Sequence, residues 1–83
     1  MKYKDYLASY VGKAVKIDKD YDTGIYTISP ASVDPTRPYW RDDILQVHDD
    51  FVVVKKYTGG GAPGVPAGYD QEAIPMNLVK FKL

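Results

Sequence analysis

Few residues in this 83-residue chain could do chemistry, and the most suggestive are consecutive. His48, the only histidine, stands directly before Asp49 and Asp50. This order suggests a histidine–carboxylate pair for acid–base catalysis. Catalytic groups are recognised by geometry rather than by adjacency, and neighbours in a strand point to opposite faces. Ser9, Ser29 and Ser32 are candidate nucleophiles, but His48 and Asp49 would not pair unless the turn bends them together. We therefore predict no catalytic residues and no enzyme activity.

A second acidic stretch could hold a metal ion. Asp18, Asp20 and Asp22 alternate as at the start of an EF-hand calcium loop. That loop requires glycine at its sixth position and glutamate at its twelfth, where this chain has Thr23 and Ser29. The chain also has no cysteine, which excludes thiolate metal sites. We therefore predict no metal site and no cofactor.

Two further stretches could bind a ligand. Trp40 stands near Arg37 and beside Arg41, so it could stack on a ligand, or it could simply anchor its loop as one large aromatic. The glycine- and proline-rich residues 58–70 do not form a phosphate-binding loop, which ends in Gly-Lys-Ser/Thr. Here Gly64 precedes Val65 and Pro66, and proline has no backbone N–H to donate. We expect a flexible loop between two strands.

The elements that must position these residues follow from apolar periodicity. Residues 2–11 predict a short helix, because Tyr3, Tyr6, Leu7 and Tyr10 share one stripe. Residues 13–18 alternate as a strand does, and residues 25–29 are rich in β-branched and aromatic types. Residues 30–43 contain three prolines and read as a loop or an edge excursion. The apolar runs 44–47 and 51–57 predict two strands around a tight turn at 48–50.

The C-terminal part predicts a strand at 71–75, a turn at 75–77 and a last strand at 79–83. We therefore expect a single domain, residues 1–83, of the mainly β class. The order of one helix followed by about five short strands favours a small, strongly bent antiparallel barrel with a short N-terminal helix. A domain of this size buries little surface alone, so self-association would stabilise it.

The amino-acid composition limits the classes of partner that we expect for this chain. The net charge is zero, with 11 basic and 11 acidic residues, which argues against a strongly basic nucleic-acid-binding protein. The N-terminal residues lack the apolar core of a signal peptide, and no apolar run is long enough to cross a membrane. Together with the absence of cysteine, this predicts a cytoplasmic protein without membrane contact.

The strand pattern resembles the Sm/LSm family, including the bacterial Sm-like RNA chaperones. The matching stretches are YLASYVGKAVKI for the helix and first strand, ILQVHDDFVVVKK for the second and third strands, and EAIPMNLVKFKL for the fourth strand, turn and fifth strand. They cover about half of the chain as patterns of apolar residues, and SH3-like and Tudor-like barrels share them. The resemblance implies a homo-oligomeric ring, joined through the last two strands, that binds single-stranded RNA in RNA processing or regulation. The alternative is a small-barrel protein-interaction or assembly module without nucleic-acid binding.

The same resemblance implies an RNA-binding site at two turns. His48, Asp49, Asp50 and Phe51 match the turn between the second and third strands, and Asn77 stands near a polar or basic position of the last turn. Phe51 would stack on a base, or it would be a buried anchor at the start of its strand. The chain departs from the family where Pro-Met-Asn replaces Arg-Gly or Lys-His, and where two aspartates would repel phosphates.

Overall fold

The computed structural model describes residues 3–33, 35–36, 40–60 and 64–83. One helix, six strands and a 3₁₀ turn follow one another along these residues, and all six strands belong to one sheet. They are α1 (Tyr3–Ser9), β1 (Ala14–Lys19), β2 (Tyr26–Pro30), β3 (Asp42–Val47), β4 (Phe51–Gly59), β5 (Gly68–Pro75), η1 (Met76–Leu78) and β6 (Val79–Phe81). The prediction of a mainly β fold with a short helix is thus confirmed.

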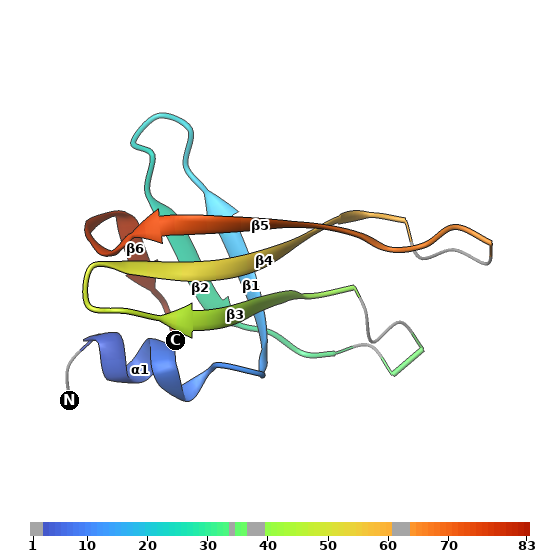
Figure 1. Ribbon diagram of the computed structural model, residues 1–83, viewed down its shortest axis with the longest axis horizontal. Coiled ribbons are helices and arrows are strands. Elements are labelled where there is room, and N and C mark those ends of the chain that lie inside the picture. The colour runs from blue at the N-terminus through green and yellow to red at the C-terminus, as the bar shows by residue number, and fades with distance from the viewer. Residues whose placement is uncertain (1–2, 34, 37–39, 61–63) are drawn as a thin grey trace.

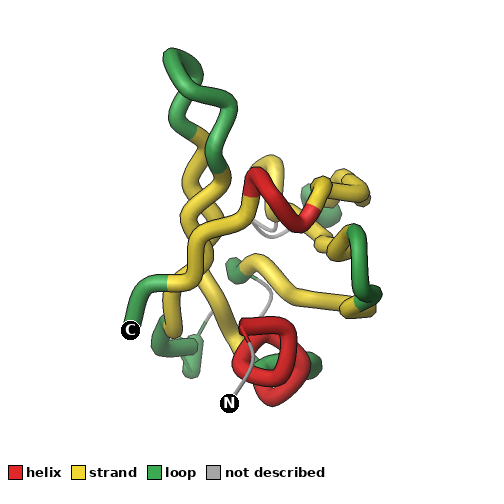
Figure 2. Tube along the Cα trace, turned by 90° about the vertical axis from the view of Figure 1, so that its left-hand side faces the viewer, coloured by secondary structure: helices red, strands yellow, loops and turns green. Residues whose placement is uncertain are grey.

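The sheet has the strand order β5-β4-β3-β1-β2-β6 and is not closed within the described residues. Figure 1 shows β3, β4 and β5 side by side, with the β1–β2 hairpin crossing them at a steep angle. In the side view of Figure 2 these two parts face each other, and α1 lies at one end of the space between them. The Tyr26 hydroxyl of β2 donates to Glu72 Oε2 of β5 over 3.0 Å, which links the two parts across that space.

The six-stranded sheet departs from the five-stranded antiparallel barrel at two points. Residues 26–30 form a full strand that lies between β1 and β6. The Sm-like pattern assigned no strand to these residues. The pairing of β2 with β6 is parallel, with Tyr26 opposite Val79. A parallel pairing needs a long connection rather than a hairpin turn, and here β3, β4, β5 and η1 lie between β2 and β6 along the chain.

The core fills the space between the two parts of the sheet. In β1 the alternation works as predicted, because Val15 and Ile17 are buried while Lys16 and Asp18 are exposed. Leu7 of α1 is fully buried in the same cluster. The cluster is completed by Ile28, Ile44, Val52, Val54, Ile74 and Val79. The aliphatic core therefore depends on one helix residue and on every strand of the sheet.

The tyrosine stripe of the helix packs mainly against the last strand. The ring of Tyr10 lies 5.0 Å from that of Phe81, and the ring of Tyr6 lies 6.4 Å from it. Tyr10 is half-buried and Tyr6 is 39% exposed. The side chain of Tyr3 lies outside the described residues. α1 is the only helix of the described part that is longer than one turn, and no helix there is long and apolar enough to span a membrane.

Asp42 belongs to a strand, which corrects the prediction of a loop over residues 30–43. Its Oδ2 accepts the backbone N–H of Ile17 in β1 over 2.9 Å, and its Oδ1 accepts that of Tyr57 in β4, also over 2.9 Å. One carboxylate thus joins three neighbouring strands. Aspartate has a low strand propensity, and this pair of bonds explains why it is tolerated there.

The glycine- and proline-rich stretch lies between β4 and β5. β4 continues to Gly59 and β5 begins at Gly68, so the two strands extend into residues 58–70 from both sides. Gly59 pairs with Gly68 after a register shift that follows Tyr57 and Tyr69. Residues 61–63 of this stretch lie outside the described residues. The described residues of β4 and β5 form a long hairpin that is paired from Phe51 and Pro75 to Gly59 and Gly68.

Candidate nucleic-acid interface

The two turns that the sequence singled out lie next to each other. The backbone N–H of Met76, at the start of η1, donates to the backbone carbonyl of Asp50 over 2.8 Å. Phe51, the first residue of β4, is paired with Pro75, the last residue of β5. The 48–50 turn and η1 therefore form one end of the sheet, which Figure 1 shows at the left.

His48 and Phe51 form a stacked pair at this end. Their ring centroids are 4.4 Å apart and the ring planes differ by 22°. The backbone N–H of His48 donates to the carbonyl of Phe51 over 2.9 Å and closes the turn. The imidazole Nε2 lies 2.9 Å from Gln46 Oε1. Phe51 is half-buried and stacks on His48, which is exposed.

Asp49 is paired with a cation from the helix. Lys4 Nζ forms an ion pair with Asp49 Oδ1, although the two residues are far apart in the sequence. The hydrogen bond and the charge of Lys4 lower the pKa of Asp49, and Asp49 raises the pKa of Lys4 in the same way. The charge of one of the two carboxylates of the turn is thereby offset by a neighbouring cation. The side chain of Asp50 is exposed.

Asn77 is exposed in the middle of η1, one residue after the Met76 amide that contacts the other turn. Its amide carries donors and an acceptor that could meet the edge of a base. All five residues of the predicted site thus come from two adjoining segments.

Two residues of this end were not predicted. Gln46 precedes His48 by two positions, so the period of a strand could have placed both on one face. Lys4 belongs to α1, and no local pattern of the sequence connects it with Asp49. That ion pair follows from the way α1 packs across the end of the sheet, which the contacts between α1, β3 and β6 record.

The other candidate groups have different surroundings. His48 contacts Gln46 and Phe51, whereas Asp49 pairs with Lys4. Ser9 donates to the backbone carbonyl of Tyr6 over 2.6 Å, as a helix serine commonly does. Among the described residues no group of three or more His, Cys, Asp or Glu side chains could hold a metal ion.

The aspartate-rich turn is held by hydrogen bonds between its own residues. Asp20 Oδ1 accepts the backbone N–H of Asp22 over 2.9 Å, and the Asp20 carbonyl accepts the N–H of Gly24 over 2.7 Å. Gly24 has a φ of 75°, a left-handed conformation that favours glycine. This turn joins β1 to β2 as a compact loop.

Trp40 lies at the opposite end of β3 from the candidate interface. Its ring stacks on that of Tyr57, with centroids 6.1 Å apart, and its indole N–H donates to the carbonyl of Gly60 over 3.2 Å. Arg41 is engaged elsewhere, because its Nη2 lies 2.8 Å from Asp43 Oδ1 and 3.4 Å from the carbonyl of Gly12. Arg37, the other cation of the predicted cluster, lies outside the described residues.

Comparison with protein-family models, with curated proteins and with solved structures finds no match.

Proposed function

We propose that copies of this chain assemble into an Sm-like ring that binds single-stranded RNA, in RNA processing or regulation in the cytoplasm. In this proposal β1, β3, β4, β5 and β6 are the five strands of a small bent barrel, and β2 is an addition to it. The observation that carries the proposal is the hydrogen bond from Met76 to Asp50, which joins the two turns of the candidate interface.

Stacking is the chemistry that this end of the sheet supports best. Base–aromatic stacking is worth about 1–3 kcal/mol per base and tolerates any sequence. The paired rings of His48 and Phe51 supply a flat surface, and Gln46 supplies an amide group beside it. Asn77 supplies a further exposed amide on the adjoining η1. The ion pair of Lys4 with Asp49 supports the proposal because the ammonium offsets one of the charges that would repel phosphates.

Assembly is supported by the two borders of the sheet. β5 stands at one border and β6 at the other, and within the described residues neither pairs with a strand on its outer side. Unpaired edges carry backbone donors and acceptors that invite another chain. If β5 of one copy pairs with β6 of the next, every copy places its 48–50 turn and η1 in an equivalent position. Repetition of a weak stacking site around a ring would then raise the affinity for a strand.

Two measurements test this function. Sedimentation equilibrium gives the mass in solution, and a monomer at micromolar concentration would refute the ring. Titration with labelled U-rich and A-rich RNA at two salt concentrations tests binding. We expect Phe51→Ala to weaken binding about tenfold. Tyr21→Ala should not change it, because Tyr21 lies in the β1–β2 turn, outside the candidate interface, and its exposed side chain is not part of the core. Equal binding by both variants would refute the stacking role.

A protein-interaction module remains the second candidate, and the free border of β5 favours it. An extended segment of a partner protein could pair with β5 and add a strand to the sheet. The same titration separates the two functions, because this module would not bind either RNA at low salt.

A further inference from the structure

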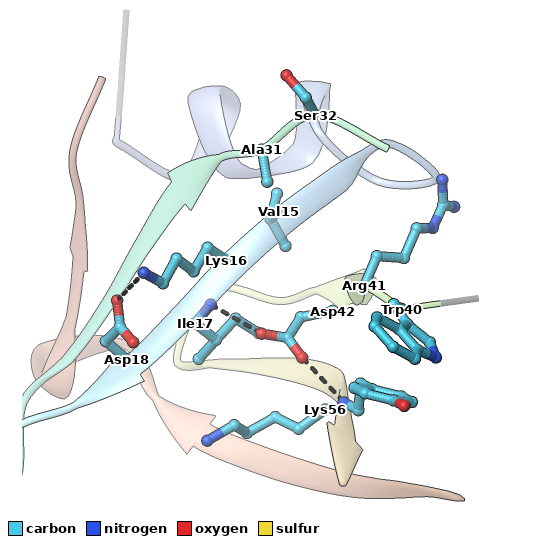
Figure 3. A pocket seen from close by; sticks show the side chains of 11 residues that line it. Val15, Lys16, Ile17, Asp18, Ala31, Ser32, Trp40, Arg41, Asp42 and Lys56 are labelled. Atoms are coloured by element: carbon cyan, nitrogen blue, oxygen red, sulfur yellow. Dashed lines mark hydrogen bonds and ion pairs between the residues drawn. The ribbon is translucent and has the colours of Figure 1, made fainter. Parts of the chain in front are cut away.

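A shallow hollow of about 420 Å³ lies at the other end of β3, away from the candidate RNA interface. It is framed by the start of β3, by β4, by β1 and by the chain that leaves β2. Figure 3 shows Trp40 at one end of this hollow and the side chains of Lys16 and Lys56 toward the other, with Asp42 between them. Its volume falls in the range of small-molecule sites, which is roughly 300–1,000 Å³.

The aromatic end of the hollow is held in place and is partly exposed. Trp40 is 42% exposed, although its ring stacks on Tyr57 and its indole N–H is bonded to the carbonyl of Gly60. The Tyr57 hydroxyl donates to the same carbonyl, so both rings are fastened to one point of the backbone. A tryptophan that only anchored a loop would bury more of its surface. A fixed, exposed indole is suited to stack on a planar ligand.

The opposite end offers positive charge. Asp42, between the two ends, has both oxygens occupied by backbone N–H groups and is fixed in place. Lys16 lies 3.9 Å from Asp18 Oδ2, and both side chains are about two-thirds exposed, which makes this a weak pair. No ion pair holds the ammonium of Lys56 within the described part of the chain, and Lys56 is half-buried. These two lysines can therefore bind an anionic group.

We propose that this hollow binds a nucleotide, with the base stacked on Trp40 and the phosphate bound by Lys56 and Lys16. A planar heteroaromatic ring joined to a phosphate matches an indole at one end and ammonium groups at the other. The nucleotide can be a free molecule or one unit of a nucleic-acid strand, since both present the same chemistry. Because the hollow and the two turns lie at opposite ends of β3, this inference does not depend on the proposed RNA-binding ring.

Calorimetric titration of the purified chain with AMP, with UMP and with a short single-stranded RNA tests the inference. We expect Trp40→Ala to weaken binding about tenfold to a hundredfold. Lys56→Gln should weaken it severalfold and reduce its dependence on salt. Should Trp40→Ala fail to fold, Lys56→Gln and Trp40→Phe carry the test. The matched control is Lys19→Gln, in β1 but outside the hollow, which should bind as the unchanged chain does.

The outcomes separate the two sources of the ligand. Binding of a mononucleotide that the Trp40 and Lys56 variants weaken assigns the hollow to a free nucleotide. Binding of the RNA alone, weakened by the same variants but not by Phe51→Ala, assigns it to a unit of a strand. Absence of binding of all three probes to the folded chain would overturn the inference, and so would binding that these variants leave unchanged.

Discussion

Replacing Asp42 should destabilise the protein more than any other change of a charged residue discussed here. Its carboxylate accepts one backbone N–H from β1 and one from β4, each over 2.9 Å, while Asp42 itself belongs to β3. A hydrogen bond to a charged group contributes about 1.5–3 kcal/mol. Asp42→Ala removes two such bonds and leaves two partly buried N–H groups to find water.

The expected cost follows from these two bonds. We expect Asp42→Ala to lower the free energy of unfolding by about 3–5 kcal/mol, which is a large part of the total for a domain of this size. Asp42→Asn keeps one carbonyl oxygen but turns its NH₂ group toward one backbone donor. It should therefore lose one bond and the charge, at a cost of about 2–3 kcal/mol.

Urea unfolding followed by far-ultraviolet circular dichroism measures both costs. The matched control is Asp18→Ala in β1, whose carboxylate is exposed and lies 3.9 Å from Lys16, so its removal should cost less than about 1 kcal/mol. If Asp42→Ala lowers stability no more than Asp18→Ala does, the carboxylate does not hold the three strands together, and this explanation of the sheet is wrong.

Three further predictions use the same unfolding measurement. Ile28→Ala should cost about 2–5 kcal/mol because Ile28 is fully buried in the core, and a loss below 1 kcal/mol would contradict that packing. Gly24→Ala should cost about 1–2 kcal/mol. The cost comes from the left-handed backbone alone, because nothing lies within 4 Å of the added methyl group. An unchanged unfolding midpoint would contradict the positive φ of Gly24. Lys4→Met should lower the midpoint at neutral pH, because the pKa of Asp49 is lowered and that of Lys4 is raised by their ion pair. The stabilising effect of this ion pair should fade as the pH falls below the ordinary aspartate pKa of 3.8 or rises above the ordinary lysine pKa of 10.5. A difference in stability between Lys4→Met and the unchanged chain that does not depend on pH would contradict the pairing.

Local pattern was enough to predict most of the strands. The apolar runs on either side of residues 48–50 became β3 and β4, and the alternation of Val15 and Ile17 became the buried face of β1. In such segments the side chains that define the pattern are the ones that the core buries, so sequence and packing agree. The same holds for Leu7, the buried member of the predicted helical stripe.

Long-range pairings were not predictable in this way. The segment 25–29 was recognised as a strand, but its place between β1 and β6 depends on residues far along the chain. The strand character of Asp42 was missed because it comes from bonds to β1 and β4 rather than from its own propensity. The ion pair of Lys4 with Asp49 likewise requires the helix to be docked first. In each case the determining contact joins segments that no periodicity relates.

The parallel pairing of β2 with β6 has a consequence for the order in which the molecule assembles. Tyr26 and Val79 are separated by roughly fifty residues, and closing so large a loop is slow compared with forming the β3–β4 hairpin. β6 has three residues, whereas β2 pairs with β1 over five positions. We therefore expect β6 to attach late and to detach early, so that the amide of Lys82, which donates to the carbonyl of Ile28 over 2.9 Å, exchanges with solvent sooner than the amides between β3 and β4.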